Sequence, residues 1–407
     1  MATPSSTLEA AAVPPLSDLS ASVVTAIRAV LPAGMAGGRV ALHEPLFAGR
    51  EWEYVKECLD TGWVSSGGAF VERFERMLAG EVGAARAVAT VNGTAALHAC
   101  LLVAGVRPGD EVVMPTLTFV ATANAVSHCG GIPHFVDSAP DTLGVDPARL
   151  ERHIAAIADR RGGAWVNRRT GRTIRAVVPV HIFGHPVDID PIAAMCRDLG
   201  MFLVEDAAEA LGSVYKGRPA GRAGRLAAFS FNGNKTITTG GGGAIVTDDA
   251  ELARQVRHLT TTARLASGWG FDHDQVGYNY RMPNINAALG CAQLEQLAGF
   301  VARKRALAAR YVDAFAGVKG VRVFVEPAFA RSNYWLNAIL LDAPAGAAPG
   351  AARDAVLAAT NEAGLQTRPV WTLMHRLPMY RDSPRDDLAV AEDLAARLVN
   401  IPSSPSL

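Results

Sequence analysis

The chain has 407 residues, of which 49% are hydrophobic and 19% are charged, and its formal net charge is zero. This balance excludes the cationic surplus that binds nucleic acids or anionic membrane surfaces, and no apolar run reaches the ~20 residues of a membrane span. No export signal is visible, and the five scattered cysteines form no CxxC pair. We therefore expect a cytoplasmic protein without disulfides.

The length predicts about two structural units, since domains usually span ~100–200 residues. Residues 1–38 are rich in Ala, Ser, Pro and Gly, and their amphipathic stretch 19–31 ends at Pro32. We interpret this segment as an N-terminal extension, part helix and part tether. We expect a large domain over residues 39–318 and a small C-terminal domain over residues 319–407.

From Ala87 onward, short apolar runs typical of buried strands alternate with amphipathic stretches typical of helices. The pattern predicts an α/β fold with a mostly parallel sheet covered on both faces. The expected strands are 88–91, 111–114, 132–136, 175–180, 202–204, 226–231 and 244–247. The expected helices are 95–103, 119–128, 190–199, 249–259 and 286–311. Beyond Val321 we expect a smaller α+β unit with strands 321–325, 335–341 and 366–370 and helices 351–363 and 390–398.

Polar motifs follow several of these strands, and in a parallel sheet ligands bind beyond the carboxyl ends of the strands. Asn92, Gly93 and Thr94 join a strand to a helix, so they form either a phosphate seat or an ordinary turn and N-cap. Asp206 follows Glu205 at the end of an apolar strand. A buried carboxylate there needs a cationic partner, unless it caps the next helix.

Lys235 stands in the segment FSFNGNKT (229–236), just ahead of a glycine-rich loop. Desolvation by its neighbours would make this lysine a nucleophilic amine, although a surface lysine in a turn fits the spacing as well. A phosphate seat, a buried carboxylate and a lysine together suit pyridoxal 5'-phosphate. The lysine would hold the cofactor covalently, the carboxylate would keep its ring nitrogen protonated, and the turn and a serine would hold its phosphate.

A metal site is not expected. His181 and His185 have the spacing of two metal ligands on one helix face, but Gly184 and Pro186 interrupt any helix there, and no HExxH motif accompanies the pair.

Four segments carry a family resemblance: PVHIFG (179–184), VEDAAE (204–209), FSFNGNKT (229–236) and GYNYRM (277–282). They resemble signature segments of the DegT/DnrJ/EryC1/StrS aminotransferases, and the resemblance covers roughly residues 40–405. It implies the aspartate-aminotransferase-like fold (fold type I), pyridoxal phosphate as cofactor and a nucleotide-linked keto sugar as substrate. The sugar dehydratase branch of this family has histidine in place of the catalytic lysine, so Lys235 favours transamination.

The resemblance assigns cofactor roles residue by residue. Lys235 matches the lysine that holds the cofactor and moves the proton, and Asp206 matches the partner of the ring nitrogen. Glu209 stands where many members carry glutamine, near the cofactor 3-hydroxyl, and there it would share a proton or accept a hydrogen bond. The remaining implied cofactor contacts are an aromatic stacked on the ring, Phe119; the phosphate turn, Gly93, Thr94 and Ala95; the phosphate-binding serine, Ser230; and an asparagine that reaches the phosphate of the neighbouring subunit, Asn279.

The resemblance also points to substrate contacts, each weighed against an ordinary turn, loop or salt-bridge role. They are Trp63, Ser65, Ser66, His181, Arg368 and His375. Within the family, the segments GWVSSG (62–67), SFNGNK (230–235) and WTLMHRLPMY (371–380) are similar to the group that makes UDP-4-amino-4,6-dideoxy-N-acetylglucosamine on the legionaminic acid or bacillosamine route.

The resemblance thus implies a homodimer that transfers the amino group of an amino acid, by family analogy L-glutamate, to C4 of a UDP-linked 4-keto-6-deoxy-N-acetylhexosamine. One alternative is the GDP-perosamine synthase reaction on GDP-4-keto-6-deoxymannose. The other is a non-catalytic regulator that keeps the fold and only binds ligand.

Overall fold

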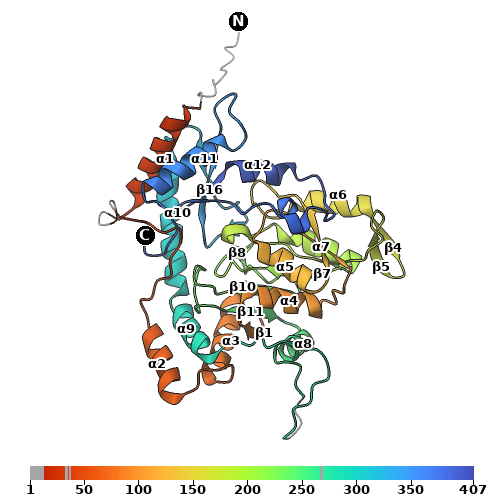
Figure 1. The fold of residues 1–407 in the computed structure, drawn as a ribbon. Helices are drawn as coiled ribbons and strands as arrows, with labels where there is room; N and C mark the ends of the chain where they lie inside the picture. Colours follow the sequence, from red (N-terminus) through yellow and green to blue (C-terminus); the bar gives the residue numbers. More distant parts are fainter. Residues whose placement is uncertain (1–12, 33–34, 36–37, 266–268) are drawn as a thin grey trace.

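A seven-stranded sheet forms the centre of the large unit in the computed structural model, which describes residues 13–32, 35, 38–265 and 269–407 (Figure 1). Its strands are β1 (Arg86–Thr90), β2 (Glu111–Pro115), β3 (Ile132–Val136), β6 (Ile174–Val177), β7 (Phe202–Asp206), β10 (Leu226–Ser230) and β11 (Gly243–Thr247). They are ordered β1-β11-β10-β7-β6-β2-β3, and within this sheet β11 runs antiparallel to both of its neighbours while the other pairs are parallel. The predicted α/β fold is confirmed.

Helices cover both faces of the sheet, because successive side chains of a strand point to opposite sides. These helices are α3 (Ala69–Val82), α4 (Gly93–Val103), α5 (Val120–His128), α6 (Pro147–Ile157), α7 (Ile189–Leu199), α8 (Ala250–Thr260) and α9 (Asn284–Leu294). On β2, Val112 and Met114 pack with α4 and α5, whereas Val113 packs with α6 and α7. α8 joins the first face, and α3 and α9 cover the β1 end of the second.

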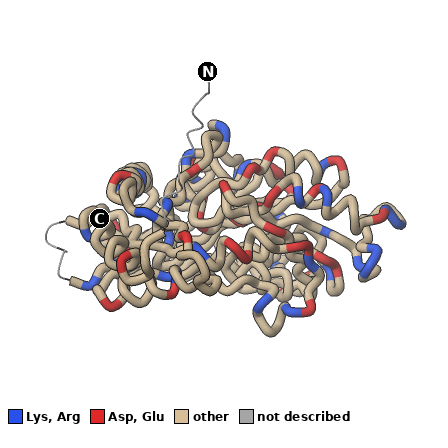
Figure 2. Tube along the Cα trace, turned by 90° about the horizontal axis from the view of Figure 1, so that it is seen from above, with Lys and Arg blue, Asp and Glu red and all other residues tan. Residues whose placement is uncertain are grey.

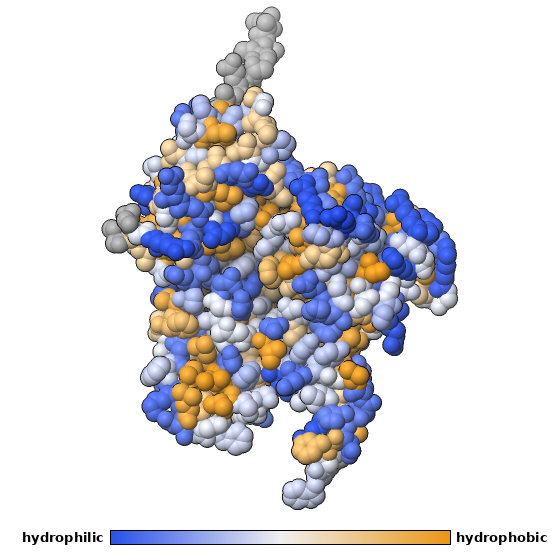
Figure 3. All heavy atoms as spheres, viewed as in Figure 1, coloured by the Kyte–Doolittle hydropathy of each residue, from blue (hydrophilic) through white to orange (hydrophobic). Residues whose placement is uncertain are grey.

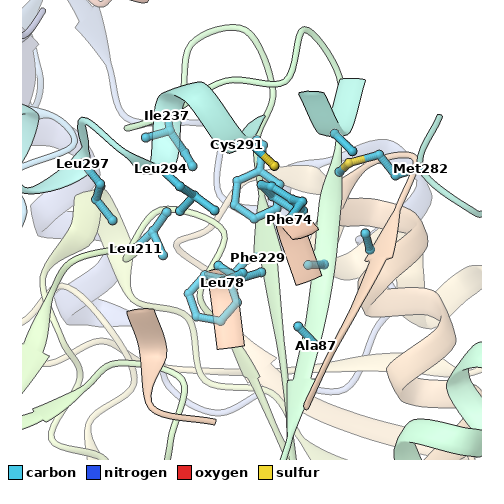
Figure 4. Packing of buried hydrophobic residues seen from close by; sticks show 14 of the residues in the cluster. Phe74, Leu78, Ala87, Leu211, Phe229, Ile237, Met282, Cys291, Leu294 and Leu297 are labelled. Carbon is cyan, nitrogen blue, oxygen red and sulfur yellow. The ribbon is translucent and has the colours of Figure 1, made fainter. Parts of the chain in front are cut away.

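The core at the β1 end of the sheet fixes the strand that leads to Lys235. Figure 4 shows Phe74 and Leu78 of α3 in one cluster with Phe229 of β10. The ring of Phe74 also meets that of Phe231 edge to face, with 5.1 Å between the centroids. Burying each such side chain stabilises a fold by about 1.5–3 kcal/mol. The packing therefore holds the end of β10 and the start of the segment that carries Lys235.

A second, smaller unit surrounds an antiparallel sheet with the order β12-β14-β16-β15. Its elements are β12 (Val321–Val323), β14 (Asn337–Leu341), β15 (Arg368–Pro369), β16 (Leu398–Ile401), α1 (Leu16–Val30), α10 (Leu297–Phe315), α11 (Ala351–Glu362) and α12 (Ala389–Arg397). Figure 1 shows α10 running from α9 up to α1 and α11. The helix expected in the N-terminal extension is thus present as α1, and it packs on α10 and α11.

Other parts of the sequence prediction stay open or were incomplete. Residues 1–12 of the extension lie outside the described residues, and the domain boundaries at 38 and 318 stay predictions. The single predicted helix 286–311 is wrong, because α9 ends at Leu294 and α10 begins at Leu297 while the apolar pattern continues through the break. The prediction also lacked several elements that the structure contains. They are the charge-rich α2 (Glu51–Thr61), α3, α6, the hairpin β4 (Ala158–Arg161) and β5 (Ala164–Asn167), the short pieces β8 (Val214–Tyr215), β9 (Arg218–Pro219) and β13 (Ala330–Arg331), and the inner strand β16 of the small sheet. In the part of the chain that the structure describes, no helix has the length and apolar character needed to cross a membrane.

Helix α1 contributes directly to the core of the small unit, which gives a test of its role. Leu19 is fully buried in a cluster with Leu307 and Tyr311 of α10. Leu19→Ala should lower the free energy of unfolding, measured by urea denaturation, by about 2–5 kcal/mol, since it leaves a cavity. Ser22→Ala, on the exposed side of the same helix, is the matched control and should change it by less than about 0.5 kcal/mol. Equal effects of the two substitutions would mean that α1 does not seal this core.

Candidate active site

One cavity of about 340 Å³ is lined by residues of all three polar motifs, which lie beyond the carboxyl ends of the strands. Gly93 and Thr94 come from the start of α4, Asp206 from the end of β7, and Ser230 from the end of β10, while Lys235 follows β10. All five line the cavity, which is the arrangement expected at the carboxyl edge of a parallel sheet. Sequence reasoning placed these residues together, and the structure brings them together.

The N-terminus of α4 forms one end of the cavity. Asn92 caps the helix by accepting a hydrogen bond from the backbone N–H of Ala95 at 2.8 Å. The N–H of Ala95 is therefore already hydrogen-bonded, and Ala95 does not line the cavity. The other two residues of the expected phosphate turn, Gly93 and Thr94, do line it. A Cβ on Gly93 would lie 2.8 Å from Cβ of Ser230, so only glycine leaves this seat open. The helix dipole favours an anion at this end.

The phosphate seat predicts the effect of a single added methyl group. Gly93→Ala should weaken pyridoxal phosphate binding at least about tenfold, measured by absorbance titration of the apoprotein, because the new Cβ crowds Ser230 and narrows the seat. Gly233→Ala is the matched control, since nothing lies within 4 Å of a Cβ at that position. Unchanged affinity in the Gly93 variant would place the phosphate elsewhere.

Strand β7 sends its last two carboxylates to opposite sides of the sheet. Asp206 points into the cavity, where one oxygen accepts a hydrogen bond from the hydroxyl of Thr122 at 2.8 Å and the other accepts one from the N–H of Ala208 at 3.1 Å. Burial raises the pKa of Asp206, although these two bonds work in the opposite direction. A buried carboxylate with only neutral direct donors is well placed to face a cationic ring nitrogen.

Lys235 lies between a carboxylate and an aromatic ring. Its Nζ donates to Oε1 of Glu209 at 3.3 Å and lies 3.9 Å from the ring centroid of Trp335. The second oxygen of Glu209 accepts a hydrogen bond from the N–H of Phe183 at 2.7 Å. Burial raises the pKa of Glu209, against the opposing charge of Lys235. The amine is thus held at the cavity wall by groups that leave one side of it open to a ligand.

Phe119 and Trp371 contribute aromatic rings to the lining of the cavity, and Phe183 packs behind Trp371. Phe119, half exposed at the start of α5, meets Trp371 with 6.1 Å between the ring centroids. Phe183 packs against Trp371 at 5.2 Å, and its backbone is left-handed with φ of 55°. Such a backbone is uncommon outside glycine and is found most often at functional sites. Exposure leaves the ring of Phe119 free to stack on a planar ligand.

His181 does not line the cavity, and its expected substrate role does not agree with the structure. The imidazole is buried, its Nε2 lies 3.0 Å from Oε2 of Glu205, and its Nδ1 accepts a hydrogen bond from the N–H of Val187 at 3.2 Å. Although burial opposes ionisation, the bonds from His181 and from backbone N–H groups lower the pKa of Glu205. His181 and Glu205 therefore form a structural pair beneath the site.

Arg368 and His375 also lie outside the cavity lining. Arg368, on β15, is exposed and donates to Oδ1 of Asn361 at 3.0 Å. Both ring nitrogens of His375 face protein groups, the hydroxyl of Thr116 at 2.8 Å and Oε1 of Glu392 at 3.2 Å. Neither residue contacts the cavity within one chain, and a substrate contact for either stays a prediction.

The remaining predicted contacts lie at the surface around α9. The backbone oxygens of Trp63 and Ser65 accept hydrogen bonds from Asn284 at the start of α9, and the Trp63 side chain is 62% exposed. Ser66 is exposed beside them, and Asn279 is exposed on the segment that leads into α9. None of these four residues lines the cavity of its own chain. Their expected roles in the site of a neighbouring subunit stay predictions.

Thr122, Trp335 and Trp371 line the cavity but were missed by sequence reasoning. Trp335 donates from its indole N–H to the backbone oxygen of Asn234, next to Lys235, at 2.6 Å. A signal existed only for Thr122, which lies one helical turn after Phe119 and so faces the same way. The two tryptophans come from the small unit, far along the chain, and no local pattern links them to the site.

The cavity fits pyridoxal phosphate on its own geometry. It offers an anion seat that a Cβ would fill at Gly93, a buried carboxylate in Asp206, a primary amine in Lys235 and an exposed aromatic face in Phe119. Among the residues that the structure describes, no group of three or more His, Cys, Asp or Glu side chains is arranged to hold a metal ion.

The chain is similar to known proteins along most of its length. Residues 46–407 match the model of the DegT/DnrJ/EryC1/StrS aminotransferase family. The chain is 39% identical to a GDP-perosamine synthase from Caulobacter vibrioides, over 91% of this chain and 94% of that protein. It is 38% identical to a GDP-perosamine synthase from Escherichia coli O157:H7, over 90% and 94% of the two chains.

Its fold matches the crystal structure of the aminotransferase TlmJ from Streptoalloteichus hindustanus with a TM-score of 0.81 and 29% identity, over 91% of this chain and 95% of that one. The fold-type-I architecture is therefore confirmed. Both of these relatives are named GDP-perosamine synthases, whereas the sequence segments favoured the group that makes a UDP-linked amino sugar. The chain belongs to the DegT/DnrJ/EryC1/StrS family of pyridoxal-phosphate-dependent nucleotide-sugar aminotransferases.

Proposed function

We propose that this enzyme transfers the amino group of L-glutamate to C4 of GDP-4-keto-6-deoxymannose. The observation that carries the proposal is the cavity that joins Lys235, Asp206 and the phosphate seat, in a chain similar to GDP-perosamine synthases along most of its length. These relatives support the GDP-linked sugar over the UDP-linked N-acetylhexosamine. Because the family consists of enzymes and Lys235 is present, a non-catalytic regulator is no longer a competing reading.

The residues that line the cavity have different roles in the proposed reaction. Bound pyridoxal phosphate supplies an electron sink for the carbanion that forms at the reacting carbon. Asp206 would hold the ring nitrogen in its protonated form, and Gly93, Thr94 and Ser230 would hold the phosphate at the start of α4. The amine of Lys235 would accept and return the proton of the substrate carbon, and Glu209 keeps this amine in place at 3.3 Å.

We further propose that two chains complete each other's sites. The segment between α8 and α9 projects from the body of the molecule (Figure 1), and Trp269, Phe271 and Val276 on it are 76–100% exposed. Apolar surface also gathers in the region of α2 and α9 on the face shown in Figure 3. On α2, Leu59 is 59% exposed. Exposed apolar surface of this kind marks an interface. Asn279, near the base of the projecting segment, would then reach the phosphate seat of the other chain.

The choice of sugar is tested by turnover of purified enzyme with L-glutamate and either GDP-4-keto-6-deoxymannose or a UDP-linked 4-keto-6-deoxy-N-acetylhexosamine. We expect kcat/KM to be at least about 100-fold higher with the GDP-linked sugar, since a site built for one set of hydrogen-bonding groups rejects an analogue that leaves them unpaired. A preference for the UDP-linked sugar would overturn the proposal and favour the substrate predicted from the sequence segments.

The shared site is tested by mixing two inactive variants. Lys235→Ala and Asn279→Ala are expected to be inactive or strongly impaired alone. If Asn279 serves the partner, one site of a mixed dimer carries both changes and the other carries none, so random subunit exchange should restore about a quarter of wild-type activity. Activity that stays at the sum of the two separate variants would show that Asn279 does not cross the interface.

A further inference from the structure

A second cavity, of about 450 Å³, lies at the opposite edge of the sheet from the projecting segment, and four of its nine lining residues are arginines. Four arginines line it, against two aspartates, and it shares no residue with the active site. It lies beside β3, the last strand at that edge, whereas the projecting segment follows α8, which packs on β1 and β11. The titratable residues that line it are Arg149, Arg152, His153, Arg169, Arg385, Asp386 and Asp387.

Both aspartates of this arginine cavity already face other groups. Oδ1 of Asp386 lies 3.1 Å from Nδ1 of His153, and Asp387 lies 4.0 Å from Arg149. Arg149 is in turn bonded to the buried carboxylate of Asp137. The acidic side chains near the cavity therefore do not neutralise the positive charge of its other three arginines.

Three guanidinium groups remain available to a ligand. Within the described chain, the side chains of Arg152, Arg169 and Arg385 form no ion pair, and Arg385 donates only to a backbone oxygen, that of Arg381. All three are exposed. Like charges around one hollow with few counter-charges raise the local concentration of anions. Figure 2 shows basic residues, interspersed with acidic ones, at the end of the molecule far from the C-terminus.

The floor and one rim of the cavity are fixed before any ligand binds. His153 is buried, and its Nε2 lies 2.8 Å from Nε2 of His134, whose other nitrogen lies 2.8 Å from Glu111. The rim that carries Arg385 is tied to β3, because the N–H of Phe135 donates to the oxygen of Pro384 and the N–H of Asp386 donates back to Phe135. A preformed hollow loses less conformational entropy on binding than a mobile surface.

We propose that this arginine cavity binds the phosphate groups of a small phosphorylated molecule. A guanidinium group presents paired N–H donors that match phosphate oxygens, which makes arginine the usual partner for phosphate. The volume lies within the ~300–1,000 Å³ range of small-molecule sites. The concave shape, and a lining with seven polar side chains against two apolar ones, Ala156 and Ile157, favour a compact anion over a protein surface.

The test is calorimetric titration of the pyridoxal-phosphate-loaded enzyme with pyrophosphate at low ionic strength. Arg152→Ala/Arg169→Ala should bind at least about tenfold more weakly than wild type at this site. The control Arg322→Ala/Arg331→Ala removes two exposed arginines from the small unit and should bind as wild type does. The active site is the same in all three proteins, so any binding there cancels in the comparison.

A charge-retaining variant makes the test stricter. Arg152→Lys/Arg169→Lys keeps the net charge but loses the paired donors, so we expect an affinity between those of wild type and the alanine variant. The absorbance of the bound cofactor, which reports on the other cavity, should be identical in every protein. Equal pyrophosphate affinity in wild type and the alanine variant, or no uptake by wild type at millimolar concentration, would overturn the proposal.

Discussion

Replacement of Lys235 by alanine should abolish transamination, with kcat reduced by at least about 10³-fold. The structure places its amine on the wall of the cavity, 3.3 Å from Glu209 and 3.9 Å from the ring centroid of Trp335, and provides no other lysine in the lining. The loss is measured as the initial rate with L-glutamate and the GDP-linked keto sugar. The yellow colour of lysine-bound pyridoxal phosphate should disappear in the same variant.

Two further variants separate the chemistry of Lys235 from its charge. Lys235→Arg keeps a cation beside Glu209 and Trp335 but offers no amine nucleophile, so it should be as inactive as the alanine variant. Lys216→Ala removes an exposed lysine that pairs with Asp188 and Asp190, and it should leave the rate unchanged. Activity above about a tenth of wild type in Lys235→Ala would remove this residue from its assigned role.

Much of the fold was predictable, because short apolar strands and amphipathic helices alternate regularly after Ala87. The prediction failed where tertiary contacts, and not the local pattern of apolar residues, decide where an element ends. The apolar spacing over 286–311 runs unbroken, yet α9 ends at Leu294 and α10 begins only after its N-cap residue Gln296, whose side chain donates hydrogen bonds to Glu51 and to the backbone oxygen of Ala292. Glu51 lies far from Gln296 in the sequence, so this contact leaves no trace in a local window.

The residues of the candidate site were likewise predictable only in part. Residues that directly follow strands, such as Asp206 and Ser230, were predictable because the carboxyl edge of a parallel sheet brings them together. Trp335 and Trp371 reach the cavity from the small unit, and only packing of the two units shows it. His181 also follows a strand, but it turns to the buried side and pairs with Glu205, so position after a strand did not decide which way its side chain points.

The neighbours Glu205 and Asp206 should respond to the same chemical change in opposite ways. Asp206→Asn should lower kcat by at least about 100-fold, because a neutral amide cannot keep the ring nitrogen of the cofactor protonated. The same variant should raise the melting temperature of the apoprotein. Its amide can still accept from the N–H of Ala208 and can donate to Thr122, whose hydroxyl can turn to Thr118 at 3.1 Å.

The direction of each change in stability follows from the shift in the pKa of the carboxyl group that is replaced. Burial raises the pKa of Asp206 in the folded apoprotein, so its contribution to stability is present below its unfolded pKa and is lost as pH rises through the folded value. At neutral pH the folded state therefore bears the cost of a buried charge, and the amide removes that cost. The gain in melting temperature over wild type should shrink as pH is lowered toward the unfolded pKa of aspartate, about 3.9.

Glu205→Gln is the matched comparison, one residue away on the other side of β7. Its carboxylate accepts from backbone N–H groups of Gly221, Ala223 and Gly224 and lies 3.0 Å from His181, and these bonds together outweigh burial and lower its pKa. Its stabilising contribution is present above the unfolded pKa of glutamate and is lost as pH falls through the folded value.

At neutral pH, Glu205→Gln should thus lower the free energy of unfolding by about 3–5 kcal/mol, measured by urea denaturation, because one amide oxygen cannot replace both carboxylate oxygens and His181 loses its partner. Folded Glu205→Gln protein should keep most of its kcat. A variant pair in which both substitutions destabilise the apoprotein, or in which Glu205→Gln costs as much kcat as Asp206→Asn, would contradict the assignment of one carboxylate to structure and the other to the cofactor.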